Sequence, residues 1–293
     1  MATQTTEEHS SSYFVPTPVP WPFMMTASLI VMLVGASIWM NGSDIGRYVF
    51  YLGVLMVFSM AFVWFRGVIN ESLAGMYRKQ EDMAFRFAMS WFIFSEVMFF
   101  GAFFGALFYI RIYAVPWLSG EGNEFFTHFY LWPQFEGGWP SNGPANVGGE
   151  FATVSAWELP LINTLLLLTS SITVTVAHWG IKENNRFKLI LGLAATVLLA
   201  VTFLFCQATE YIEAYKELGL TLGSGVYGST FFMLTGFHGA HVTLGTIMLS
   251  VILLRSLKGH FSSDDHFGFE AVSWYWHFVD VVWLVLFIFV YVL

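Results

Sequence analysis

Residues 227–254 read YGSTFFMLTGFHGAHVTLGTIMLSVILL, a stretch with no Lys, Arg, Asp or Glu. A helix needs about 20 mostly apolar residues to cross the roughly 30 Å hydrocarbon core of a bilayer, and this stretch is long enough to cross with some tilt. Further long apolar runs lie at residues 22–40, 48–64, 84–109, 157–176, 189–205 and 272–293. The sequence therefore predicts an all-α integral membrane protein with seven transmembrane helices.

The composition agrees with a lipid environment. Of the 293 residues, 56% are hydrophobic and only 11% are charged, whereas a soluble domain has about 25% charged residues. A net charge of −8 without a basic patch argues against binding to nucleic acid. Cys206 is the single cysteine, which excludes an intrachain disulfide and every multi-cysteine metal centre.

The Lys and Arg residues predict the orientation, because cytoplasmic loops carry the excess of positive charge. One side has Arg66, Arg78, Lys79, Arg86, Lys182, Arg186, Lys188, Arg255 and Lys258, and the other has Arg47, Arg111 and Lys216. The N-terminal segment 1–21 is then cytoplasmic, the C-terminus lies on the outer side, and the loop at about 112–155 is external. This loop is rich in Gly, Pro and aromatic residues, which indicates an ordered cap at the membrane surface.

Several ionisable side chains are expected at similar depth inside the membrane: Glu96, His238, His241, His277 and Asp280. Such residues are costly in hydrocarbon and mark functional sites or buried polar networks. Glu96 is either a proton-active carboxyl or a neutral acid that holds helices together, and we expect it to be protonated and hydrogen-bonded to a histidine of the 227–254 run. The histidines are either metal ligands or interhelical hydrogen-bonding groups. Metal sites of this kind need more histidines, so no metal is expected.

A second candidate site lies at the inner surface and consists of Arg66, Glu71, Arg255, Lys258 and His260. Basic clusters at headgroup height bind anionic lipids. The same residues are also compatible with ordinary positive charge on the cytoplasmic side, and their pattern alone does not separate the two interpretations.

Several blocks resemble subunit III of cytochrome c oxidase, a haem-copper oxidase. They are SEVMFF at 95–100, WELPLINTLLLLTS at 157–170, VYGSTFFMLTGFHGAHV at 226–242 and HFGFEAVSWYWHFVDVVW at 266–283, together with PVPWPF at 18–23 and WFRGVINES at 64–72. The blocks follow one another in the family's order over almost the whole chain.

The resemblance implies a membrane domain over 22–293, with a two-helix part at about 22–66, a five-helix part at about 84–293 and a V-shaped cleft between them that holds phospholipids. It implies no haem, copper or catalytic centre in this chain. These cofactors belong to partner subunits of a proton-pumping oxidase, with subunit I as the main contact and subunit II in the same complex.

The implied role is that of an accessory subunit in aerobic respiration, which supports proton uptake and protects the catalytic centre from inactivation during turnover. Glu96 matches the family's carbodiimide-reactive carboxyl, and the inner-surface residues match positions near lipid headgroups. Phe65, Gly67, Met76 and Tyr77 depart from the family pattern around that lipid site.

The external loop is longer than in mitochondrial relatives, which indicates a bacterial version in the inner (plasma) membrane. The alternatives are subunit III of a quinol oxidase, a stand-alone proton transporter built around Glu96, and a membrane metalloenzyme that uses His238, His241 and His277. Quinol-oxidase counterparts usually have five helices, so seven runs favour the cytochrome c branch.

Overall fold

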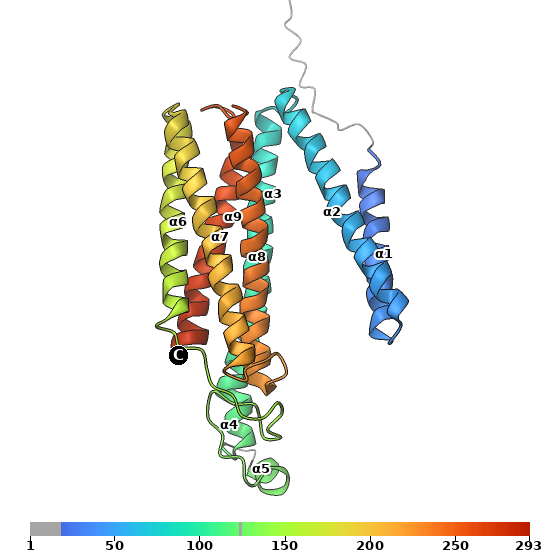
Figure 1. Cartoon of the computed structure of the whole chain (residues 1–293), viewed down its shortest axis with the longest axis vertical. Coiled ribbons are helices and arrows are strands. Elements are labelled where there is room, and N and C mark those ends of the chain that lie inside the picture. The colour runs from blue at the N-terminus through green and yellow to red at the C-terminus, as the bar shows by residue number, and fades with distance from the viewer. Residues whose placement is uncertain (1–18, 123–124) are drawn as a thin grey trace, which may run out of the picture. The chain divides into compact units, whose positions relative to one another are not determined.

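The computed structural model describes residues 19–122 and 125–293, and every regular element in them is a helix (Figure 1). Within these residues, seven helical spans are long and apolar enough to cross a membrane. They are built from α1 (Trp21–Met40), α2 (Asp44–Leu73), α3 (Lys79–Tyr109), α6 (Leu159–Lys182), α7 (Arg186–Lys216), α8 (Gly225–Leu257) and α9 (Phe267–Leu286). The predicted seven-helix fold is confirmed. Most of the predicted segment 1–21 lies outside the described residues.

Most helices are longer than the apolar runs that predicted them. Helix α2 continues nine residues past Trp64 to Leu73, and α7 starts at Arg186 and ends at Lys216. Polar residues at the membrane surface remain helical because the backbone hydrogen bonds close within the helix whatever the solvent. Hydropathy therefore locates the part of a helix that hydrocarbon surrounds, and the helix itself extends into the headgroup region.

The loop predicted to be external begins later in the chain than residue 112. Helix α3 is followed by a π-helical turn (Ile110–Ala114) and by α4 (Val115–Leu118), so the chain stays helical past residue 112. Tyr109, Tyr113 and Trp117 follow one another at helical spacing, with ring centroids 5.9 Å and 5.6 Å apart. These rings lie along the helical continuation beyond the apolar run.

The chain divides into two compact units, Met1–Phe85 and Arg86–Leu293. The first contains the hairpin of α1 and α2, in which backbone meets backbone at glycines. A Cβ atom on Gly53 would lie 2.4 Å from the Cα of Met32, and one on Gly35 would lie 2.3 Å from the backbone nitrogen of Phe50. Small residues allow this close approach between membrane helices, where packing rather than the hydrophobic effect drives association.

The second unit is a bundle of α3, α6, α7, α8 and α9, with large side chains in its core (Figure 1). The indole nitrogen of Trp276 donates a hydrogen bond to Ser170 Oγ at 2.9 Å, and that of Trp283 donates to Thr164 Oγ1 at 2.9 Å. Both indoles are buried, and both find an acceptor on α6. These two bonds fix the register of α9 against α6.

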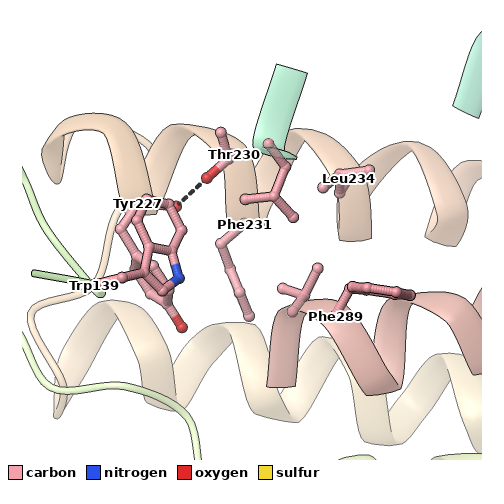
Figure 2. A pocket seen from close by; sticks show the side chains of 8 residues that line it. Trp139, Tyr227, Thr230, Phe231, Leu234 and Phe289 are labelled. Atoms are coloured by element: carbon pink, nitrogen blue, oxygen red, sulfur yellow. Dashed lines mark hydrogen bonds between the residues drawn. The ribbon is translucent and has the colours of Figure 1, made fainter. Parts of the chain in front are cut away.

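The loop after α4 contains α5 (Phe125–Leu131) and packs on one end of the bundle. Figure 2 shows the indole of Trp139 beside Tyr227 of α8, and their ring centroids are 5.5 Å apart. The backbone nitrogen of Tyr227 donates to Ser141 O at 3.0 Å, and that of Ala152 donates to Leu218 O at 2.8 Å. Backbone hydrogen bonds and aromatic contacts thus attach this segment to the ends of α7 and α8.

Gly53→Ala should destabilise the α1–α2 hairpin, because the new methyl group would collide with the backbone of Met32. Overpacking of this kind costs about 1–3 kcal/mol, more than the gain of up to about 1 kcal/mol from replacing a helical Gly by Ala. The measurement is the temperature at which this subunit aggregates when the purified protein is heated. Gly67→Ala, also in α2, is the matched control, since its nearest neighbour would be 4.0 Å away. Equal aggregation temperatures for the two variants would show that the close contact between Gly53 and Met32 does not limit the stability of the hairpin.

Candidate functional site

The predicted hydrogen bond between Glu96 and a histidine of α8 is present. Glu96 Oε2 lies 3.0 Å from His241 Nε2 and thereby joins α3 to α8. The other ring nitrogen, His241 Nδ1, lies 2.6 Å from the carbonyl oxygen of Phe237. A carbonyl only accepts, so Nδ1 carries a proton and donates it. The pair is therefore either a neutral acid donating to a neutral imidazole or a carboxylate facing an imidazolium.

Both forms of this pair have the same net charge of zero and differ only in the position of one proton. Aromatic rings surround the pair: the centroid of Phe100 is 5.0 Å from that of His241, and Tyr275 stacks on the same imidazole at 6.4 Å. The side chains of His241 and Glu96 are only 16% and 21% exposed. A low-polarity setting favours the neutral arrangement, because separated charges lose solvation there.

His238 does not join the Glu96–His241 pair. Its ring is buried between Phe203 of α7 and Trp283 of α9, with centroids 5.9 Å and 5.2 Å away, and neither ring nitrogen has a hydrogen-bond partner among the described residues. Residues three apart on a helix differ by about 60° around the axis. That rotation is enough to send His238 and His241 into different interfaces.

His277 and Asp280 form a third location. His277 Nδ1 lies 2.7 Å from Ser171 Oγ, which links α9 to α6. Asp280 is 5% exposed, and both of its carboxylate oxygens lack a hydrogen-bond partner in the described part of the chain. No hydrogen bond connects either residue to Glu96 or His241 in these residues. The five predicted polar residues thus occupy three separate interfaces of one bundle.

A further carboxyl, which the sequence led us to expect solvated or hydrogen-bonded at headgroup level, is buried. Glu210 of α7 is 1% exposed, and its Oε1 accepts from Tyr291 Oη at 2.7 Å and from Gln207 Nε2 at 3.1 Å. Asn163 of α6 in turn donates to Gln207 Oε1 at 3.4 Å. Glu210 falls near the end of an apolar run, where either solvation or hydrogen bonding at headgroup level is expected. The signal available in the sequence was the spacing of Gln207 and Glu210, which places them on one helix face.

Two of the residues predicted at the inner surface, Arg66 and Glu71, belong to the first unit. Arg66 is exposed, and Glu71 Oε2 accepts a hydrogen bond from Tyr77 Oη at 2.5 Å. Burial and the adjacent Glu71 carboxylate raise the pKa of Tyr77, so its hydroxyl remains a donor. Tyr77 is one of the positions that depart from the family pattern, and here it supplies the partner of Glu71.

The other residues predicted at the inner surface belong to the second unit and are Arg255, Lys258 and His260. The guanidinium of Arg255 lies 4.5 Å from the ring centroid of Phe261, and Lys258 is exposed. Burial, with the positive charges of Arg255 and Lys258, lowers the pKa of His260. At neutral pH the positive charge of this cluster therefore resides on Arg255 and Lys258.

Comparisons with known proteins decide the family. A family model described as "Cytochrome c oxidase subunit III" matches residues 11–121 and 124–293. The chain belongs to the cytochrome c oxidase subunit III family. Similar proteins named "Cytochrome c oxidase subunit 3" include those of Prototheca wickerhamii (40% identical, 94% of each chain), Danio rerio (39%, 96% of each) and Arabidopsis thaliana (38%, 97% of each). The resemblance found from the motifs is confirmed, and the chain is a subunit of an oxidase complex.

The motifs that carried the subunit III resemblance bond to one another across the bundle. Glu96 of SEVMFF pairs with His241 of VYGSTFFMLTGFHGAHV. Ser170 of WELPLINTLLLLTS accepts from Trp276 of HFGFEAVSWYWHFVDVVW. The blocks that identify the family are therefore also the blocks that hold its five-helix bundle in register.

A double-mutant cycle should show that Glu96 and His241 are coupled. Replacing each by Ala, singly and together, should give a coupling free energy of about 0.6–1.7 kcal/mol, the range for hydrogen bonds between membrane helices. The measurement is the unfolding free energy of the subunit in the purified complex. The matched control is the cycle of Ser95→Ala with His241→Ala, because Ser95 is exposed and its hydroxyl donates to Phe92 O in its own helix. Additive effects in both cycles would show that the pair contributes no specific stability.

Proposed function

We propose that this chain is the non-redox accessory subunit of a proton-pumping cytochrome c oxidase, that it packs on subunit I beside subunit II, and that it supports proton uptake and protects the haem-copper centre during turnover. The family match over nearly the whole chain carries this proposal. Haem and copper then belong to the partner subunits. The complex oxidises cytochrome c, and this chain keeps the catalytic subunits active during turnover.

The arrangement of the buried polar groups favours an accessory role over a metalloenzyme. His238, His241 and His277 would have to converge on one ion in that alternative. Instead, His241 bonds to Glu96, His277 bonds to Ser171, and His238 lies between Phe203 and Trp283. Each side chain contributes to a helix–helix contact, as expected for a scaffold.

The Glu96–His241 pair gives the scaffold a proton-active element. The pair holds one shared proton at zero net charge, and it lies in an apolar setting. Reaction with hydrophobic carbodiimides requires a protonated acid in such a place, so Glu96 is the residue in this chain that we expect to react. The electron path does not include this chain, and Glu96 therefore affects turnover only through the partner subunits.

The location proposed for the complex is a bacterial inner membrane, with the N-terminus cytoplasmic and the C-terminus periplasmic. The excess of Lys and Arg at the ends that follow α2, α6 and α8 supports this orientation. The long segment after α4 supports a bacterial source.

A tag after Leu293 should bring down the other oxidase subunits with haem a absorption, and the haem should stay with those subunits when this chain is stripped away.

Glu96→Gln in the intact complex should change the initial rate of oxygen reduction by less than about twofold, because no electron passes through this subunit. The measurement is oxygen uptake with reduced cytochrome c as donor. A tenfold loss, about 1.4 kcal/mol of activation free energy, would contradict the accessory role. Turnover only with a quinol would assign the complex to the quinol-oxidase branch.

The cluster of Arg255, Lys258 and His260 in the second unit is proposed to hold an anionic phospholipid headgroup, and removing its positive charges should weaken that binding. Each basic residue near a membrane surface contributes about 1 kcal/mol, so Arg255→Gln and Lys258→Gln should each lower lipid affinity about fivefold. The measurement is mass spectrometry of phosphatidylglycerol retained by the delipidated and re-lipidated complex. Lys216→Gln is the control, because Lys216 is an exposed lysine at the opposite end of the bundle. Equal lipid retention in all three variants would contradict the site.

A further inference from the structure

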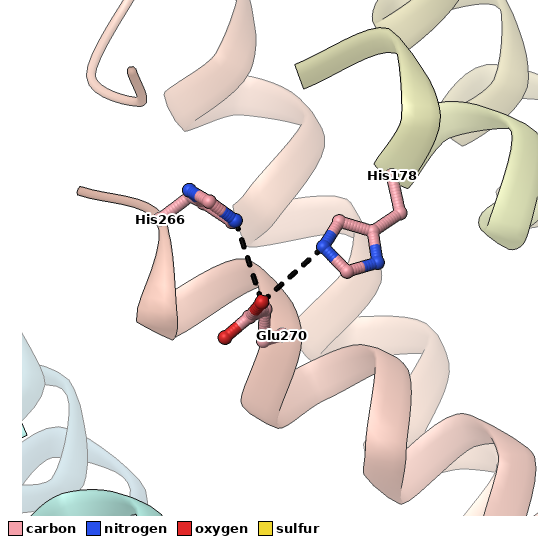
Figure 3. Close-up of side chains that lie close together, drawn as sticks. All are labelled: His178, His266 and Glu270. Carbon is pink, nitrogen blue, oxygen red and sulfur yellow. Dashed lines mark ion pairs between the residues drawn. The ribbon is translucent and has the colours of Figure 1, made fainter. Parts of the chain in front are cut away.

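A cluster outside the Glu96 site gathers two histidines and a carboxylate at one end of the bundle. His178 lies in the last two turns of α6, His266 is the residue before α9, and Glu270 lies in the first turn of α9. His178 Nε2 and His266 Nε2 are each 3.4 Å from the same oxygen, Glu270 Oε1 (Figure 3). All three potential ligand atoms lie within 4.8 Å of one another.

The spacing of these atoms matches the edge of a tetrahedral zinc site. Zn–N and Zn–O bonds of about 2.0–2.2 Å place neighbouring ligand atoms of a tetrahedron about 3.4 Å apart. The same distance is long for an N–H···O hydrogen bond. Both Nε2 atoms are buried and have no hydrogen-bond partner among the described residues. Two imidazoles thus point at one carboxylate oxygen without forming good hydrogen bonds to it.

The tautomer of His266 also suits a metal ligand. Its Nδ1 lies 3.0 Å from the carbonyl oxygen of Ser262. Since a carbonyl only accepts, Nδ1 carries the proton, and in the neutral ring Nε2 presents its lone pair toward Glu270. A metal-binding histidine in proteins nearly always has its other nitrogen held in this way.

Glu270 is oriented for binding through one oxygen. Its Oε2 forms an ion pair with Arg86 Nη1 of α3 at 2.5 Å, and its Oε1 faces the two histidines. A ligating carboxylate is typically held by such an outer partner. The positive charge of Arg86 opposes a cation, so the site should bind metal less tightly than a His₂Glu site without an arginine.

We propose that His178 Nε2, His266 Nε2 and Glu270 Oε1 bind one Zn²⁺ ion, with water in the fourth position. Two imidazoles and one carboxylate suit Zn²⁺, whereas Mg²⁺ and Ca²⁺ prefer oxygen ligands alone. The sequence interpretation predicted no metal in this chain, because it placed His178 and His266 near or outside the membrane edge and found too few histidines within the membrane. A bound ion here would join the end of α6 to the start of α9.

Zinc content of the purified oxidase complex tests this proposal. The complex is dialysed against micromolar Zn²⁺ and then against metal-free buffer, and zinc is counted by mass spectrometry. His178→Ala and His266→Ala should each remove one zinc per complex or weaken its binding at least about tenfold. X-ray absorption at the zinc edge should lose a contribution from two imidazoles. The matched control is Glu183→Gln, which removes an exposed carboxylate just beyond the end of α6 that pairs with Lys188.

Two further measurements distinguish a loss of zinc binding from a failure to fold. Glu270→Gln keeps the side-chain shape but is a poor zinc ligand, and assembly with the other subunits reports whether each variant folds. Assembled Glu270→Gln complex that lacks one zinc supports the site. Equal zinc in the wild type and in all three ligand variants overturns it, and so does an equal loss of zinc in Glu183→Gln.

Discussion

Hydrocarbon supplies no hydrogen-bond partners, and this single constraint organises the bundle. A polar group inside the membrane therefore depends on partners within the protein, and the bundle supplies them for several side chains. The indoles of Trp276 and Trp283 reach hydroxyls on α6, and Glu96 reaches His241 across the α3–α8 interface. Each of these contacts has one geometry in which both groups are satisfied. Together they convert non-directional packing of apolar helices into a defined register.

The two units solve the packing problem in different ways. The α1–α2 hairpin uses glycines, so that backbones touch and dispersion contacts are made over the length of the pair. The bundle instead fills its centre with Trp, Phe and Leu side chains, and the indole nitrogens of Trp276 and Trp283 donate hydrogen bonds to α6. A two-helix pair has no enclosed centre in which a large side chain is surrounded, so close approach is its means of burying surface. A five-helix bundle has such a centre and can use large rings.

Depth in the membrane was readable from the sequence, and rotation about the helix axis was not. Counting residues at a rise of about 1.5 Å each is enough to place Glu96 and His241 at one level, which is why their hydrogen bond was predictable. The direction in which a side chain points around the helix axis depends on which helix packs against each face. The residues that decide this packing lie in other parts of the chain. His238 therefore faces α7 and α9 although it shares a helix with His241, and Glu210 is buried although hydropathy places it at a helix end.

The same two residue types perform different tasks at different depths. At mid-membrane, Glu96 and His241 form a closed pair, in which one shared proton satisfies both groups at zero net charge. At the end of the bundle, Glu270 already has Arg86 on one oxygen and faces two imidazoles with the other. A single proton cannot join all three groups, because it can form a hydrogen bond between Glu270 Oε1 and only one of the two imidazole nitrogens at a time. A cation with several coordination positions can satisfy them together, and water at the membrane surface gives it access. Depth thus separates a proton-holding pair from a cation-binding cluster.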